Sequence, residues 1–298
     1  MNSRKFSDFA KYGAGRTFFD NEYYRIARLS KNYLLTYFLS QRNGKLFQDV
    51  KTYCTFIGHM KSGGSMLGAL LDAHPNAVFS DEANILEHVQ FGFNKNQLFQ
   101  IVLRNAKAEA LKGRVTARRL GGYSWAVPGQ WQGNHGIIQV LGDTTTGVST
   151  RSLSLKSDLM QKLHKVMTGI QVKFIHVIRN PFDPMAASMV RGKRSFESAL
   201  ENYFAACGLL MDLRKRIDPG NLLAVRYEDF VETPHESLRA VCGFLGLGVT
   251  DDYLNACGQV INSSDKSRAL VEWKPEWVSI IHNRIDQYDF LKGYTFES

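Results

Sequence analysis

The sequence lacks the features of several large classes of protein. Its 298 residues carry a formal net charge of +9, yet the basic residues are scattered and form no dense run, so no nucleic-acid partner is expected. The four cysteines include no close pair with the spacing of metal ligands, and we expect them to be buried, reduced thiols. We therefore predict that the protein holds no metal.

Signals for export or membrane insertion are also lacking. The first residues carry no apolar core typical of a secretion signal. The apolar stretch 23–39 contains Arg25, Arg28 and Lys31, which indicates an amphipathic helix rather than a membrane span. We expect this helix to pack on the edge of the protein, within an N-terminal helical extension over residues 1–50. These observations predict a cytoplasmic protein with no membrane partner.

Neither an internal repeat nor a low-complexity linker divides the chain, so we predict a single domain over residues 1–298. Apolar, β-prone runs predict strands at residues 53–57, 77–79, 137–141, 172–178 and 221–225. Helical patterns cover residues 94–112, 151–167, 196–217, 235–247 and 277–290. Because strands and helices alternate, we predict an α/β fold, a P-loop-type three-layer sandwich with a mostly parallel central sheet and helices on both faces.

The most informative stretch is a glycine-rich loop between a predicted strand and a predicted helix. Residues 58–65 read Gly-His-Met-Lys-Ser-Gly-Gly-Ser, and the apolar helical face 66–71 follows directly. In such a loop the backbone N–H groups point into one concavity at the positive end of a helix dipole. The loop is therefore expected to bind a phosphate-like anion.

The loop departs from the pattern G-x4-G-K-[ST] that binds nucleoside triphosphates. Gly58, Gly63 and Ser65 fit the pattern, but Gly64 occupies the lysine position and the only lysine, Lys61, lies three residues earlier. This difference counts against a P-loop kinase. A lysine on the crown of the loop suits the transfer of a group from a shorter anion.

Charged residues follow the predicted strands where they end. Asp81 and Glu82 follow one strand, and Asp143 follows the next. Arg179 comes directly after the strongest predicted strand. Since ligands gather at the carboxyl ends of parallel strands, these side chains are expected to face the same crevice as Lys61. From position alone, Asp81 and Glu82 fit equally well as acidic charges at the start of a helix.

A loop rich in aromatic residues and glycine, over residues 121–133, is a candidate wall of an acceptor pocket. Exposed rings on loops often line binding sites, although they also cover cores. His59, His74 and His88 are candidate proton acceptors, but single histidines are more often structural. The residues predicted to line the pocket are Tyr123, Trp125, Trp131, His88 and Asp143.

These motifs resemble those of the sulfotransferases that use 3′-phosphoadenosine-5′-phosphosulfate (PAPS). Residues 61–65, Lys-Ser-Gly-Gly-Ser, resemble the loop that binds the 5′-phosphosulfate group in that family. Arg179 and Ser188 resemble the arginine and serine that hold the 3′-phosphate, although the usual spacing places Ala187 at the position of the serine. Residues 227–234 resemble the segment whose tyrosine borders the adenine.

Within that family, residues 70–76 together with Asp81 and Glu82 are most similar to the tyrosylprotein-sulfotransferase branch and its bacterial relatives. The resemblance implies that Glu82 and Lys61 are the catalytic residues, and that residues 53–268 form the donor-binding core. It further implies that the donor contacts Lys61, Ser62, Gly63, Gly64, Ser65, Met66, Arg179, Ser188, Tyr227, Lys266, Ser267 and Arg268.

The resemblance also implies the chemistry. A sulfonyl group passes in line from PAPS to a hydroxyl or amine of a small-molecule acceptor, as in natural-product tailoring, and 3′-phosphoadenosine-5′-phosphate (PAP) is released. Glu82 takes the proton of the acceptor as general base, while Lys61 stabilises the charge on the leaving phosphate. No step needs a metal. A P-loop nucleotide kinase and a non-catalytic nucleotide-binding module remain as alternatives, and the sequence is compatible with a homodimer.

Overall fold

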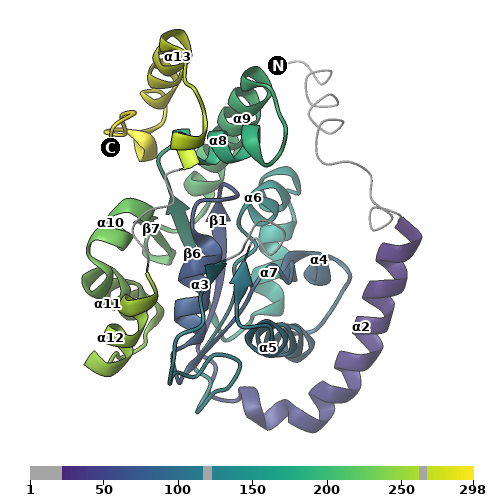
Figure 1. Cartoon of the computed structure of the whole chain (residues 1–298). Helices are drawn as coiled ribbons and strands as arrows, with labels where there is room; N and C mark the ends of the chain where they lie inside the picture. Colours follow the sequence, from purple (N-terminus) through teal and green to yellow (C-terminus); the bar gives the residue numbers. More distant parts are fainter. Residues whose placement is uncertain (1–21, 117–122, 262–266) are drawn as a thin grey trace.

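The computed structural model describes residues 22–116, 123–261 and 267–298. At its centre lies a five-stranded parallel sheet with the strand order β2-β5-β1-β6-β7 (Figure 1). The middle strand, β1, pairs in parallel with β5 on one side and β6 on the other, so the loop after β1 emerges at the centre of the carboxyl edge. The strands are β1 (Thr52–Gly58), β2 (Ala77–Ser80), β5 (Val140–Asp143), β6 (Gln171–Ile178) and β7 (Leu222–Arg226).

Both faces of this sheet are covered by helices. All seven residues of β1 are buried, as expected for a parallel strand enclosed on both sides. Alternate residues of β1 enter two separate apolar clusters: Tyr53 and Ile57 belong to one, and Cys54 and Phe56 to the other. Helices within residues 85–111, 146–166 and 196–216 contribute to the first cluster, whereas helices within residues 64–72 and 227–260 contribute to the second. The predicted three-layer α/β sandwich is therefore confirmed.

The helices that form these layers follow the strands in alternation. They are α3 (Gly64–Asp72), α4 (Ile85–Gln90), α5 (Lys95–Leu111), α6 (Thr146–Leu155), α7 (Leu159–Val166), α8 (Phe182–Val190), α9 (Phe196–Arg216), α10 (Tyr227–Glu232), α11 (Pro234–Leu245), α12 (Asp251–Val260) and α13 (Pro275–Ile285). Short 3-10 turns are η2 (Gly44–Phe47), η4 (Pro219–Asn221), η5 (Ser267–Leu270) and η6 (Asp289–Leu291), and a small antiparallel pair joins β3 (Val115–Thr116) to β4 (Tyr123–Ser124).

The structure corrects the sequence prediction in two helical regions. The helix expected over 277–290 ends at Ile285. The helix expected over 151–167 is two helices, α6 and α7, because the backbone at Lys156 is extended (φ −111°, ψ 100°). Ser157 and Asp158 separate them, and both are residue types that favour helix starts. The short helices α10 and α12 were not predicted, since their apolar patterns are too brief to stand out from the neighbouring turns.

The N-terminal part is a long helix, α2 (Glu22–Asn43), which runs along one side of the molecule (Figure 1). It packs on α5, and its Arg25 and Arg28 form ion pairs with Glu87 of α4. The helix therefore covers the edge of the protein, as the sequence predicted. Within residues 22–116, 123–261 and 267–298, no helix combines the length and apolarity needed to cross a membrane.

Candidate active site

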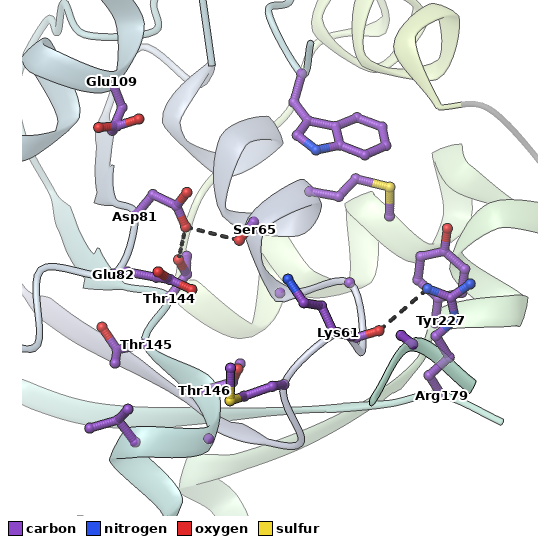
Figure 2. A pocket seen from close by; sticks show the side chains of 18 of the residues that line it. Lys61, Ser65, Asp81, Glu82, Glu109, Thr144, Thr145, Thr146, Arg179 and Tyr227 are labelled. Carbon is purple, nitrogen blue, oxygen red and sulfur yellow. Dashed lines mark hydrogen bonds between the residues drawn. The ribbon is translucent and has the colours of Figure 1, made fainter. Parts of the chain in front are cut away.

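A cavity of about 770 Å³ opens at the carboxyl edge of the sheet. Its walls come from the loop after β1, the turn after β2, the segment after β5, helix α8 and the start of α10 (Figure 2). Residues that line it include Lys61, Gly63, Gly64, Ser65, Met66, Asp81, Glu82, Glu109, Trp125, Thr144, Thr145, Arg179, Arg191, Tyr227 and Ser267. The cavity therefore gathers side chains that lie far apart in the sequence.

The loop after β1 follows a path that depends on glycine. Gly58, Lys61 and Gly63 have φ values of 136°, 68° and 100°. At Gly63 an added Cβ atom would lie 2.4 Å from the ring of Tyr227, so only glycine fits. Helix α3 begins at Gly64, and the N–H groups of a first helical turn have no intrahelical partners. The loop therefore has the geometry of an anion-binding concavity.

The crown of this loop is tied to the end of β6. The Arg179 guanidinium donates a hydrogen bond from Nη1 to the carbonyl oxygen of Lys61 at 3.3 Å. Its Nε lies 3.6 Å from a carboxylate oxygen of Asp183, and its Cζ lies 4.2 Å from the ring centroid of Tyr227. Lys61, Arg179 and Tyr227 are thus held side by side, as Figure 2 shows. Ser62, by contrast, is buried within the loop, with 1% of its surface exposed.

Helix α8 and the residue that follows it present Ala187 and Arg191 to the cavity. They are four positions apart and so lie on the same face of the helix. Ser188 lies on the same helix but is not among the described residues that line the cavity. Arg191 was not among the predicted site residues. The sequence signal that could have found it is its spacing of one helical turn from Ala187, the position where the family motif places its serine.

Residues 266–268, a basic segment near the C-terminus, contribute less to the cavity than the sequence predicted. Ser267 lines the cavity, whereas Lys266 lies outside the described residues. The Arg268 guanidinium donates hydrogen bonds to Asp183 (2.7 Å) and to the carbonyl oxygens of Phe296 (2.6 Å) and Ser298 (2.7 Å). Arg268 is 5% exposed and is therefore used in packing the C-terminal segment against α8.

Glu82 lies in a strained turn directly after β2. Its φ is 54°, and that of Asn84 is 51°, values that non-glycine residues adopt rarely and that are enriched at functional sites. Burial raises the pKa of the Glu82 carboxyl, and the neighbouring Asp81 carboxylate raises it further. The Lys61 ammonium acts in the opposite direction. Glu82 is therefore a better proton acceptor than a solvated glutamate.

Asp143, predicted to line the pocket, lies beneath this turn. Its two carboxylate oxygens accept four hydrogen bonds, from the Ser80 and Thr145 hydroxyls (2.9 and 2.7 Å) and from the N–H groups of Ala83 and Ile85 (3.0 and 3.2 Å). Asp143 is 1% exposed, and burial raises its pKa. Through these bonds its carboxylate holds the backbone that follows Glu82. Asp143 is not among the described residues that line the cavity.

The predicted aromatic wall is only partly present. Trp125 lines the cavity, and its main-chain N–H donates to the carbonyl oxygen of Arg114 at 3.1 Å. Trp131 is 43% exposed and is not among the described residues lining the cavity. Tyr123 belongs to β4, but its side chain lies outside the described part of the structure.

Two histidines that compete with Glu82 as bases are structural in their surroundings. His88 is 1% exposed, and its Nδ1 lies 3.1 Å from the carbonyl oxygen of Asn84. His59 stacks on Tyr203, and burial lowers the pKa of His59 to about 4. Neither is among the described residues that line the cavity. The described ranges also contain no group of three or more His, Cys, Asp or Glu residues placed to hold a metal ion.

The fold and the cavity define an α/β protein with a glycine-rich, anion-binding loop at the carboxyl edge of a parallel sheet. Residues 161–251 match the model of the sulfotransferase family, and this segment includes β6, Arg179, α8 and Tyr227. This segment is therefore similar to sulfotransferases, which are enzymes, and it carries part of the candidate site.

Three solved structures are similar to this chain at low identity. The sulfotransferase domain of the Synechococcus olefin synthase is 18% identical with a TM-score of 0.43, over 78% of this chain and 84% of that chain. The sulfotransferase STF1 of Mycobacterium tuberculosis is 14% identical (TM-score 0.47, 93% and 88% covered). A mouse sulfotransferase solved in complex with PAP is 13% identical (TM-score 0.45, 82% and 87% covered). These values assign no acceptor to this chain, and no curated protein sequence matches it.

Proposed function

We propose that this protein transfers a sulfonyl group from PAPS to a hydroxyl or amine of a small-molecule acceptor, with Glu82 as general base. The observation that carries the proposal is that one cavity combines the glycine-rich loop and its Lys61, the arginine pair Arg179 and Arg191, and the carboxyl of Glu82. An anion site, a second cationic site and a proton acceptor are the three parts that such a transfer requires.

The residues present fit a nucleotide with phosphates at two positions. The main chain at Gly63 and Gly64 leaves a space for an anion that side chains would take up. A Cβ added at Gly64 would lie 2.8 Å from the Thr146 methyl group. Arg179 and Arg191 supply a second cationic region, and charge-assisted hydrogen bonds from arginine are well suited to phosphate. The Tyr227 ring, packed on Gly63, is placed to border a base.

Bound PAPS would supply the sulfonyl group and PAP would be its leaving part. Lys61 and the N–H groups of the first turn of α3 would stabilise the negative charge that grows on the leaving phosphate, because preorganised donors need no rearrangement as that charge develops. Arg179 and Arg191 bind the 3′-phosphate and so fix the position of the nucleotide. Glu82 removes the acceptor proton as the new bond forms, which contributes roughly 10²–10⁴-fold in rate for a positioned base.

The size and lining of the cavity support a small acceptor. Its volume of about 770 Å³ lies within the range of small-molecule sites and must hold the donor as well. Apolar groups of Met60, Val115, Trp125 and Val148 line it beside the carboxylates, so the acceptor combines a hydroxyl or amine with an apolar body. All four cysteines are free and buried, which is compatible with a reducing, cytoplasmic setting.

The experiment is to incubate the protein with PAPS labelled in its sulfonyl group and with a panel of phenols, alcohols, amines and tyrosine-containing peptides. We expect label to pass to at least one small hydroxyl or amine compound. Robust labelling of the peptides alone would contradict the small-molecule acceptor. Magnesium-dependent turnover of ATP without any transfer from PAPS would contradict the proposed reaction and favour a kinase.

A further inference from the structure

Asp81 links two segments of the candidate site. Its Oδ1 accepts hydrogen bonds from the Ser65 hydroxyl at 3.0 Å and from the Thr144 hydroxyl at 2.8 Å (Figure 2). Its main-chain N–H donates to the side-chain oxygen of Asn105 in α5 at 2.9 Å. Because Ser65 lies in the first turn of α3 and Thr144 follows β5, one carboxylate oxygen joins the anion-binding loop to the neighbouring strand end.

The residue after Asp81 is the proposed base. Glu82 has a left-handed backbone, and the next residues are held by Asp143 through the N–H groups of Ala83 and Ile85. Main chain on both sides of Glu82 is therefore fixed, on one side by Asp81 and on the other by Asp143. The distance between Glu82 and the loop bearing Lys61 depends on the hydrogen bonds that Asp81 accepts.

We propose that Asp81 is a positioning residue for sulfonyl transfer, which sets both the geometry and the charge environment of Glu82. The inference rests on the proposed function, because it assigns Asp81 a role through Glu82 and through Ser65. Asp81 holds the first turn of α3 in register with the base, so that donor and acceptor sites keep a fixed separation. It also places a negative charge directly beside the carboxyl that must accept the proton.

The charge environment of Glu82 comprises groups from four segments. Asp81 belongs to the same turn, Lys61 faces it from the loop, Asp143 lies beneath it at the end of β5, and Glu109 faces it from α5. After burial, Asp81 is the largest cause of the raised pKa of Glu82; Asp143 and Glu109 add to it, while Lys61 lowers it. Removing the charge of Asp81 must therefore make Glu82 a weaker base.

The geometry of Asp81 allows its two roles to be separated. Both hydroxyls donate to the same oxygen, and an asparagine retains one such oxygen. Asp81→Asn can therefore keep these two hydrogen bonds, which form a clamp between Ser65 and Thr144, while it removes the charge. Asp81→Ala removes both the clamp and the charge. Thr144→Val removes one arm of the clamp and leaves the charge. Asp212→Asn is a matched control, since Asp212 is an exposed aspartate on α9.

The test measures the pKa of Glu82 and the affinity for PAP, and neither needs turnover. Carbon-13 NMR of labelled glutamate carboxyls follows the Glu82 signal, which is assigned by its loss in Glu82→Gln. We expect the Glu82 titration to move to lower pH in Asp81→Asn and to stay unmoved in Asp212→Asn and Thr144→Val. By calorimetry, Asp81→Ala should bind PAP roughly tenfold more weakly than Asp81→Asn, about the effect of one lost hydrogen bond.

An unchanged Glu82 titration in Asp81→Asn would overturn the charge role. Equal PAP affinities in Asp81→Ala and Asp81→Asn would overturn the clamp. If Asp81→Ala does not fold, Thr144→Val takes its place, and PAP affinity equal to that of the unmodified protein would overturn the clamp. An unmodified protein that does not bind PAP would contradict the proposed donor instead, and the titration of Glu82 would still decide the charge role.

Discussion

The two halves of the candidate site are built in different ways. The loop after β1 is made of main chain: glycines set its path, and the start of α3 supplies its N–H groups. The turn after β2 is made of side chains, because Asp81 and Asp143 accept hydrogen bonds that hold Glu82 between them. One half is encoded in eight consecutive residues, and the other in residues up to 63 positions apart.

The difference teaches where each half is sensitive to substitution. The path of the loop does not allow an added Cβ at Gly63. The positive charge that the loop brings to the cavity comes from Lys61. In the turn, a change of one carboxylate alters both the backbone and the charge around Glu82. Substitutions in the turn should therefore lower activity by changing the protonation of Glu82. Substitutions in the loop should lower activity by weakening the stabilisation of charge on the leaving phosphate.

Glu82→Gln should give the largest effect, because it removes the proton acceptor and keeps the shape. We expect turnover to fall by roughly two to four orders of magnitude, within the usual range for a general base. PAP binding should be nearly unchanged. The measurement is turnover with the best acceptor together with PAP affinity and melting temperature. If the variant stays active and only melts at a lower temperature, Glu82 is a charge at a helix start and not the base. The control is Glu201→Gln, because Glu201 is an exposed glutamate on α9.

Lys61→Ala should be next in size. The loss of one preorganised charge at the leaving phosphate is expected to lower turnover by roughly 10²–10³-fold, while the fold is kept. Lys61 also lowers the pKa of Glu82, so its removal should raise that pKa. Since the base must be ionised, the acid limb of the pH–rate profile should move to higher pH, opposite to the shift expected for Asp81→Asn. A variant that keeps its turnover and its profile would contradict both roles.

Arg191→Ala and Ser188→Ala compare a residue directly after α8 with one in its last turn, and they should give a smaller effect. Arg191 lines the cavity and Ser188 does not, so only the first change should weaken PAP binding, by roughly tenfold or more for a lost charge-assisted hydrogen bond. Calorimetry with both variants gives the comparison. A larger loss of PAP affinity in Ser188→Ala would contradict this expectation and assign the 3′-phosphate to Ser188, the residue that resembles the serine of the family motif.

The sequence predicted the layers of the fold and the loop, because both follow from local patterns of apolar residues and glycine. It also placed Arg179 correctly at the end of β6. It could not show that Asp143 lies beneath the turn, since a carboxylate at a strand end looks the same whether it faces the cavity or the backbone. Likewise, Arg268 pairs with Asp183, a contact across eighty-five positions that no local pattern reveals. The role of Asp81 depends on such distant contacts as well.

The most direct test of the central claim is the affinity of the unmodified protein for PAP compared with 5′-AMP, measured by calorimetry under one set of conditions. The two nucleotides differ by the 3′-phosphate, which only the region of Arg179 and Arg191 is proposed to bind. We predict that PAP binds at least tenfold more tightly, and that it raises the melting temperature by mass action far more than 5′-AMP does. Equal affinities would contradict the account, because the second phosphate site would then be absent.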